Sequence, residues 1–403
     1  MSEQKQRSVD PAVLEMVEVA ATRGLPTIWD RLDAQKGQCR FGREGLCCRM
    51  CFMGPCRVTE EGKGAQQGIC GATAETIVAR NLLRHVAGGA AAHSDHGREI
   101  VKTLFLAASG DSKAYQIRSP GRMRSLAVEF GVALDGRSDS DVAAELARLF
   151  LAEFGKQDGT LLNIQRAPEA QRANWRAAGV TPRGIDREIV TGLHMTTMGV
   201  DNDPEHLLLA AARVALADGW GGSMIATDLS DVLFGEPEPL RSAANLGVLK
   251  QDHVNILVHG HEPTLSDVIA AVSRDPQMVA EANAVGAKGI NLAGICCTAN
   301  EILMRHGIPI AGNFLQQELA VMTGAIDLLL VDVQCVFPAL ARLQECFHTK
   351  VVSTSPKAKL PGAEHIEFHE EHALDCARQI IRMAIDSFRR RDPAKVRIPK
   401  AHQ

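Results

Sequence analysis

The spacing of hydrophobic positions changes near Pro237 and divides the chain into two parts of different character. After Pro237, short apolar runs alternate with stretches whose apolar residues recur at helical spacing. The apolar runs predict buried strands at 254–259, 289–295, 309–313, 328–333 and 351–354. The amphipathic stretches predict helices at 264–274, 276–285, 299–306, 315–323 and 338–346. This alternation is typical of a parallel sheet covered by helices.

The part of the chain before Pro237 has helical periodicity almost throughout. Asp10-Pro11 predicts the start of a first helix, since Asp caps helices and Pro favours the first helical position. The apolar stripe of this helix comprises Val13, Leu14, Val17 and Ala20. Further helices are predicted at 74–86, 91–108, 141–154, 185–193 and 204–217.

The end of the chain predicts one more helix, at 371–390. The basic, proline-punctuated residues 391–403 are typical of a linker or a chain terminus. The overall prediction is an α plus α/β protein. It has a helical domain over 1–236, a Rossmann-like, doubly wound parallel sheet over 237–390, and a tail.

Composition limits the classes of function. With 403 residues and 45% hydrophobic content, the chain is long enough for two or three globular domains. A net charge of −4 and a single tyrosine argue against a nucleic-acid surface, which needs a basic excess. The sequence has neither an apolar run long enough to span a membrane nor the apolar stretch of a signal peptide over residues 1–10. A cytoplasmic location is expected.

Six of the eleven cysteines lie between residues 39 and 70, a density that indicates iron-sulfur ligation. A cubane-type cluster needs four thiolates from different directions, usually from a tight loop and one more distant residue. Four of the six have this arrangement, and these are Cys48, Cys51, Cys56 and Cys70. Gly54-Pro55 turns the chain between Cys51 and Cys56, and a longer stretch with glycines leads to Cys70.

Cys39 and Cys47 remain as a pair, which is too few thiolates for a second cluster. We infer that they meet their copies across a two-fold axis, where two subunits share one cluster, so a homodimer is expected. Four arginines thread the same stretch, at Arg40, Arg43, Arg49 and Arg57. They could offset the charge of thiolate-bound clusters, although a solvated basic loop explains them equally.

Two other interpretations of the cysteines stay open. Structural zinc favours paired Cys-x-x-Cys knuckles, and this stretch has one such pair, Cys48 with Cys51, beside a Cys47 that a knuckle does not need. Disulfides would require an oxidising compartment, which the lack of a signal peptide argues against. Iron-sulfur ligation is favoured over both.

A second group of candidate ligands follows the predicted strands. In open α/β sheets, ligands bind beyond the carboxyl ends of the strands. His261, the pair Cys296-Cys297, and Cys335 each follow a different strand. Imidazole and thiolates at three strand ends of one sheet predict a metal site, although a single buried cysteine at a strand end is usually a core residue.

His93 and His96 lie three residues apart in the predicted helix 91–108 and so share one face of it. Imidazole changes charge near neutral pH, so such a pair can relay protons to a buried site. Paired surface histidines are also common, and the spacing alone favours that simpler interpretation.

Together these motifs resemble the catalytic subunit of the anaerobic nickel-iron carbon monoxide dehydrogenases over the whole chain. The resemblance rests on the cysteine stretch and on five further motifs in the same order. These are Ala92-His93-Ser94-Asp95-His96, Ala226-Thr227-Asp228-Leu229-Ser230-Asp231, His259-Gly260-His261, Gly294-Ile295-Cys296-Cys297-Thr298 and Val331-Asp332-Val333-Gln334-Cys335. Each motif is weak alone, whereas all of them in order are specific.

The resemblance implies oxidation of carbon monoxide with water to carbon dioxide, two protons and two electrons, and the reverse reaction. In this family carbon monoxide binds nickel in a nickel-iron-sulfur cluster, and hydroxide on a neighbouring iron attacks the bound carbon. It implies that His261 ligates that iron and that Cys297 and Cys335 bind cluster irons. Cys297 is preferred because its separation from Cys335 resembles the family's spacing, and Cys296 stays second.

The same resemblance assigns one 4Fe-4S cluster to Cys48, Cys51, Cys56 and Cys70, and a second, shared across the homodimer, to Cys39 and Cys47. Electrons would leave through these clusters to a ferredoxin-like acceptor. His93 would be a general acid/base, helped by His96. Family members often continue this helix face with further histidines, whereas Glu99 and Lys102 stand here, which leaves the proton path open.

Family enzymes also have a second Rossmann-like domain that adds three cysteine ligands and a lysine. This sequence ends before such a domain, so His261, Cys297 and Cys335 form an incomplete ligand set. We expect that the chain cannot assemble a working nickel site by itself. It would be a fragment of a longer subunit or one of two polypeptides that form the site.

Two other functions stay open. The chain could be an electron-transfer iron-sulfur subunit without its own active site, or a hybrid-cluster-type redox enzyme acting on hydroxylamine or nitric oxide. The His259-Gly260-His261 string and the cysteine pair Cys39 and Cys47 favour carbon monoxide dehydrogenase.

Overall fold

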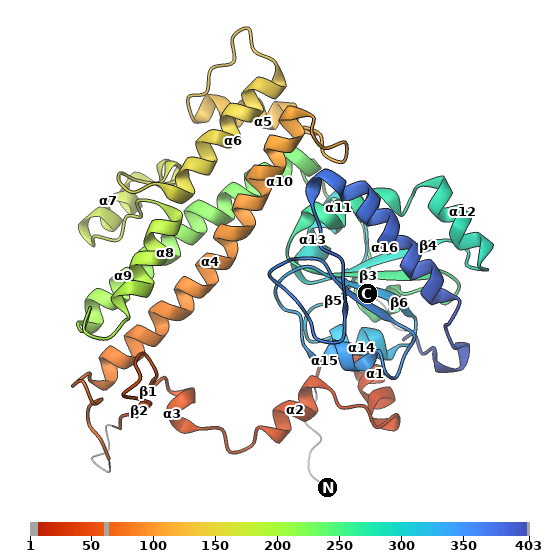
Figure 1. Cartoon of the computed structure of the whole chain (residues 1–403), viewed down its shortest axis with the longest axis horizontal. Helices are drawn as coiled ribbons and strands as arrows, with labels where there is room; N and C mark the ends of the chain where they lie inside the picture. The colour runs from red at the N-terminus through yellow and green to blue at the C-terminus, as the bar shows by residue number, and fades with distance from the viewer. Residues whose placement is uncertain (1–6, 60–63, 401–403) are drawn as a thin grey trace. The chain divides into compact units, whose positions relative to one another are not determined.

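The computed structural model describes residues 7–59 and 64–400, so the last three residues of the predicted tail lie outside it. The chain divides into two compact units, whose elements are labelled in Figure 1. An α/β unit is formed by residues up to 36, residues 110–116 and residues from 234 onward. A helical unit is formed by residues 37–109 and 117–233.

The α/β unit is built on a parallel sheet of six strands. The strands are β3 (Val254–Gly260), β4 (Ile290–Ile295), β5 (Ile310–Gly312), β6 (Ile326–Val331), β7 (Lys350–Ser353) and β8 (Glu364–His365). Their order is β5-β4-β3-β6-β7-β8, and every neighbouring pair is parallel. This order is that of a doubly wound Rossmann sheet, in which the chain reverses direction of winding between β3 and β6. The predicted parallel α/β sheet is confirmed.

Helices connect these strands and leave the two central strands, β3 and β6, buried along their whole length. The helices are α11 (Pro263–Val272), α12 (Pro276–Ala284), α13 (Cys296–His306), α14 (Gln317–Met322), α15 (Ala339–Leu343) and α16 (Ala373–Phe388). Their bounds lie close to the predicted ones, except that α13 begins at Cys296 rather than at Ala299 and α15 ends at Leu343 rather than at Cys346.

Two segments that the sequence placed outside the α/β domain belong to its core. In α1 (Pro11–Thr22), Ala12, Val13, Met16 and Ala20 are buried in the same apolar cluster as residues of β4 and β6. Val396, in the predicted tail, is buried in this cluster as well. A short α2 (Ile28–Ala34) follows α1. The unit therefore draws on both ends of the described chain.

The helical unit is organised around one long helix, α4 (Ala74–Ser109), which packs against α6, α8 and α9 (Figure 1). The sequence predicted two helices here, because Gly88-Gly89 costs helix stability, at about 1 kcal/mol for each glycine. The helix continues through them in the structure. The other helices are α3 (Arg40–Arg43), α5 (Pro120–Glu129), α6 (Asp139–Gly155), α7 (Glu169–Ala177), α8 (Ile185–Met195), α9 (Pro204–Ala217) and α10 (Met224–Phe234). None of the described helices is long and apolar enough to cross a bilayer.

The tail is held to the sheet by a buried ion pair between Arg391 and Asp327, whose side chains are 5% and 0% exposed. Arg391 Nε donates to Asp327 Oδ1 at 3.1 Å, and the guanidinium also donates to the carbonyl oxygens of Gln251 and His253. His348 Nε2 contacts the same carboxylate at 2.8 Å.

Arg391→Met is expected to lower the free energy of unfolding by about 3 kcal/mol, because it leaves a buried carboxylate without its guanidinium partner. Urea unfolding followed by circular dichroism measures this change. The control is Arg389→Met, since Arg389 is 62% exposed and should change stability by no more than about 0.5 kcal/mol. Equal stability of the two variants would contradict the anchoring of the tail.

Candidate metal centres

A short hairpin places cysteines of the helical unit on two different faces. β1 (Cys47–Cys48) pairs antiparallel with β2 (Cys56–Arg57), with Cys48 opposite Cys56 and Cys47 opposite Arg57. Residues directly opposite each other share a face of a sheet, and successive residues of a strand face opposite ways. Cys48 and Cys56 therefore share one face, and Cys47 faces the other way.

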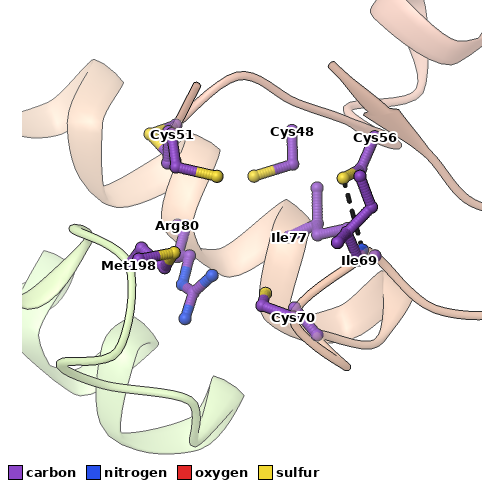
Figure 2. Close-up of a pocket in the computed structure, with 11 residues that line it drawn as sticks. Cys48, Cys51, Cys56, Ile69, Cys70, Ile77, Arg80 and Met198 are labelled. Carbon is purple, nitrogen blue, oxygen red and sulfur yellow. Dashed lines mark hydrogen bonds between the residues drawn. The ribbon is translucent and has the colours of Figure 1, made fainter. Parts of the chain in front are cut away.

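Four cysteine thiols line one pocket of the helical unit, and they are Cys48, Cys51, Cys56 and Cys70. Figure 2 shows their sulfur atoms around a common space, with Arg80 and Met198 beside it. The backbone N–H of Ile69 donates to Cys56 Sγ at 3.4 Å. These are the four cysteines that spacing selected. Cys39 and Cys47 do not line this pocket, and Cys39 is exposed.

The pocket contains a buried cation that the sequence analysis missed. Arg80 is 1% exposed, and its guanidinium donates to the carbonyl oxygen of Asp201 at 2.8 Å and to Asn202 Oδ1 at 2.6 Å. Both acceptors are neutral, so the guanidinium charge can offset negative thiolates beside it. The signal in the sequence is an arginine on the buried stripe of α4, three residues after Ile77 and three before Leu83. The arginines selected from sequence, Arg40, Arg43, Arg49 and Arg57, are all exposed.

In the α/β unit, the candidate ligands follow three adjacent strands, β4, β3 and β6. Gly260, which precedes His261, forms a bridge with Cys296 at the start of α13. The Cys296 thiol in turn contacts the Cys335 thiol. The segments that carry His261, Cys296-Cys297 and Cys335 thus lie at one edge of the sheet.

The environment of these thiols favours their protonated form. Burial, together with the neighbouring Cys335 and Cys297, raises the pKa of Cys296 to about 12. Burial and Cys335 also raise the pKa of Cys297. A metal ligand must be deprotonated, so a cation bound here has to displace these protons. Among the described residues, no three His, Cys, Asp or Glu side chains converge closely enough to hold one metal ion.

The backbone of the Cys335 loop is held in an unusual conformation from inside the sheet. Gln334 and Cys335 both adopt left-handed conformations, with φ of 68° and 57°. Buried His259 contacts the Cys335 carbonyl oxygen through Nε2 at 3.2 Å, and Gln317 Nε2 donates to the same oxygen at 2.9 Å. Burial lowers the pKa of His259, which favours the neutral ring.

His93 and His96 lie on α4 in the helical unit, and the structure adds an acidic partner for His93. His93 Nδ1 contacts Asp218 Oδ1 at 2.8 Å, and the Ser223 hydroxyl donates to the same oxygen at 3.1 Å. The hydrogen bond from Asp218 raises the pKa of His93, against the opposing effect of burial. His96 is buried.

Asp218 begins a π-helical turn, Asp218–Ser223, that sequence reasoning missed. The turn approaches α4 so closely that a Cβ at Gly222 would lie 2.9 Å from the His93 carbonyl oxygen. A Cβ at Gly97 would lie 2.7 Å from the Gly222 carbonyl oxygen. The glycines after Asp218 were the available signal, because such turns often mark functional sites. Further along α4, Lys102 Nζ contacts Glu99 Oε1 at 3.5 Å, so these two side chains pair with each other.

Comparison with known proteins identifies the family. A profile of the Prismane/CO dehydrogenase family matches residues 46–400. The chain belongs to this family. Carbon monoxide dehydrogenase 1 of Methanosarcina mazei is 55% identical over 398 residues, which cover 99% of this chain and 63% of the relative. Carbon monoxide dehydrogenase 1 of Carboxydothermus hydrogenoformans is 46% identical, covering 98% of this chain and 62% of the relative.

A solved structure shows the same fold. The nickel-free crystal structure of carbon monoxide dehydrogenase from Thermococcus sp. AM4 superposes with a TM-score of 0.96 at 49% identity. The match covers 98% of this chain and 63% of that one. The resemblance inferred from the motifs is confirmed at the level of the Prismane/CO dehydrogenase family. The chain spans somewhat under two thirds of the length of these relatives.

In this family member, we expect Asp218→Asn to lower the pKa of His93, because the substitution removes the carboxylate that favours the imidazolium. The pKa of His93 lies above its ordinary value of 6.5, so its ion pair stabilises the fold fully below about pH 6.5. That contribution is lost as the pH rises through the raised pKa, and it should be absent from Asp218→Asn. NMR titration of labelled imidazoles measures both proteins, with exposed His194 as the unaffected reference. An unchanged His93 titration curve would contradict the pairing.

Cluster loading is expected to protect residues 39–70 from trypsin. Val58 is a buried apolar residue of this segment, whereas its arginines are exposed, so bound metal should supply much of the order. Limited proteolysis with mass spectrometry compares the apoprotein and the iron-loaded protein at Arg40, Arg43, Arg49 and Arg57. Arg80 is buried and should resist cleavage in both states. Equal cleavage of the segment with and without iron would show that the prediction is wrong.

Proposed function

We propose that this chain takes part in the oxidation of carbon monoxide by water to carbon dioxide, two protons and two electrons. The observation that carries the proposal is the position of His261, Cys297 and Cys335 directly after three adjacent parallel strands, β3, β4 and β6. Family membership and relatives named carbon monoxide dehydrogenase support the same reaction. The electrons leave through thiolate-bound clusters of the helical unit to a ferredoxin-like acceptor.

The four-thiol pocket fits a 4Fe-4S cluster. Cys48, Cys51, Cys56 and Cys70 supply the four thiolates that such a cluster needs. The N–H of Ile69 donates to the Cys56 sulfur, and a hydrogen bond of this kind stabilises the reduced cluster. Buried Arg80 offsets part of the thiolate charge.

His261, Cys297 and Cys335 hold one side of a nickel-iron-sulfur cluster in this proposal. When bound, such a cluster supplies the binding of carbon monoxide and its two-electron oxidation. Soft thiolates and imidazole suit iron and nickel. Cys296 contacts the Cys335 thiol and is the next candidate ligand. Three ligands are fewer than a cluster of this kind needs, so it requires others in addition to these.

His93 accepts and releases the protons of the reaction as a general acid/base. Asp218 contacts its Nδ1, which orients the ring and stabilises its protonated form. His96, one helical turn further along α4, shares this work.

The active assembly is a homodimer. The hairpin and the loop after it expose large apolar side chains, with Phe52 fully exposed, Ile69 66% exposed and Met53 50% exposed. Apolar surface of this kind indicates a partner, and a second copy of the chain would cover it. Cys39 and Cys47, which lie outside the four-thiol pocket, then share a second 4Fe-4S cluster with their copies.

Anaerobic reconstitution with iron, sulfide and nickel tests the proposal. We expect about six iron atoms per chain from the relay clusters, four in the pocket and two as half of the shared cluster. Further iron with nickel and carbon monoxide-dependent viologen reduction is expected where the ligand set of the active cluster is complete. Cys51→Ser should remove about four iron atoms per chain, whereas Cys346→Ser, at an exposed cysteine with no assigned role, should keep them all.

Two results would contradict the proposal. Zinc in place of iron at the four thiols would make the segment a structural zinc site. The relay iron without any nickel, in a protein supplied with a complete ligand set, would favour an electron-transfer subunit.

A further inference from the structure

One carboxylate joins the three segments that carry the candidate ligands. Asp332 directly follows β6, and its Oδ1 accepts hydrogen bonds from the backbone N–H groups of His261, at 2.7 Å, and Val333. Its Oδ2 accepts from the Glu262 N–H at 3.3 Å and from the Thr298 hydroxyl at 2.9 Å. The four donors therefore come from the loop after β3, from α13, and from the loop after β6.

Each of these donors lies within two residues of a candidate ligand in the sequence. The first is the backbone of His261 itself, and Thr298 directly follows Cys297. Val333 lies two residues before Cys335. A shift of the carboxylate would therefore move all three ligand-bearing segments relative to one another.

The carboxylate of Asp332 lies so close to the backbone that position 260 requires a glycine. Gly260 has a φ of 144°, and a Cβ built there would lie 1.6 Å from Asp332 Oδ1. Any other residue at this position would displace the carboxylate or the loop. Gly260 also pairs with Cys296, so the same residue connects two of the segments.

We infer that Asp332 is a positioning residue that sets the relative placement of His261, Cys297 and Cys335 before any metal binds. The inference rests on the proposed function for the use of these ligands. Metal sites are held in place by hydrogen bonds to the groups around the ligands, and both oxygens of Asp332 accept from donors on the three ligand-bearing segments. The protein thus fixes the backbone segments that carry these ligands.

Amide hydrogen exchange of the metal-free chain tests the inference directly. Asp332→Asn should increase exchange about tenfold at Glu262, and less at His261 and Val333, because the amide replaces one of the two accepting oxygens with a donor while its remaining oxygen can accept from both other amides. The control is Asp252→Asn, which changes a 47% exposed carboxylate just before β3 to an amide and should leave these three sites unchanged. Unchanged exchange in Asp332→Asn would overturn the inference.

Two substitutions at Thr298 separate positioning from packing. Thr298 is fully buried. Thr298→Val keeps the shape and removes the donor to Asp332, whereas Thr298→Ser keeps the donor and removes a methyl group. Positioning predicts faster exchange at His261 and Glu262 in the valine variant and near-normal exchange in the serine variant. The opposite order would assign Thr298 a packing role and overturn the inference.

The metal-loaded protein supplies the second readout. After reconstitution of a protein whose active-cluster ligand set is complete, Asp332→Asn and Thr298→Val should lose metal beyond the relay iron, and Thr298→Ser should retain it. Altered exchange with full metal retention would also overturn the positioning role. If the wild-type protein with the complete ligand set binds no such metal, the proposed function fails, and the exchange comparison alone still decides how Asp332 acts.

Discussion

The candidate active site depends on one constraint: β4, β3 and β6 are adjacent, parallel strands of the sheet. Parallel strands end at the same edge and lie about 4.8 Å apart, so residues far apart in sequence come within reach of one ligand. Gly260 then bridges to Cys296, and Asp332 binds the backbone of His261. The loops at this edge are fixed by hydrogen bonds to the sheet itself.

In the helical unit, the candidate ligands are brought together in a different way. Its four-thiol pocket is formed by a two-stranded hairpin and an adjoining loop with a small apolar core of Val58, Ala72, Ala74 and Ile77. The long helix α4 supplies a rigid wall and a buried arginine, and the remaining order is left to the bound metal. The sheet thus fixes the segments that carry one set of candidate ligands, whereas the other set lies in a segment with a small core.

Local sequence pattern predicted the elements that are buried on both faces or densely periodic. The five longer strands were found, whereas β8, Glu364–His365, has no apolar pattern and was missed. The sequence could not show that α4 continues through Gly88-Gly89, because packing against distant helices decides it. Packing between residues far apart in the sequence also decides that α1 lies in the α/β core.

The ligand candidates were predictable because thiol spacing and strand ends are visible in the sequence. Their partners were not. Asp218 lies far along the chain from His93, and Arg80 is held by Asp201 and Asn202, so only the folded chain brings these groups together. Asp332 stood inside a motif, yet its hydrogen bonds to three segments required the sheet to be known.

Iron-edge anomalous scattering from crystals of the anaerobically reconstituted protein tests the central claim most directly. The account predicts iron among Cys48, Cys51, Cys56 and Cys70 and iron between Cys39 and Cys47 of two copies. In a protein with a complete ligand set it also predicts metal beside His261, Cys297 and Cys335. Iron absent from the four-thiol pocket, or an active-site metal bound away from the ends of β4, β3 and β6, would contradict it.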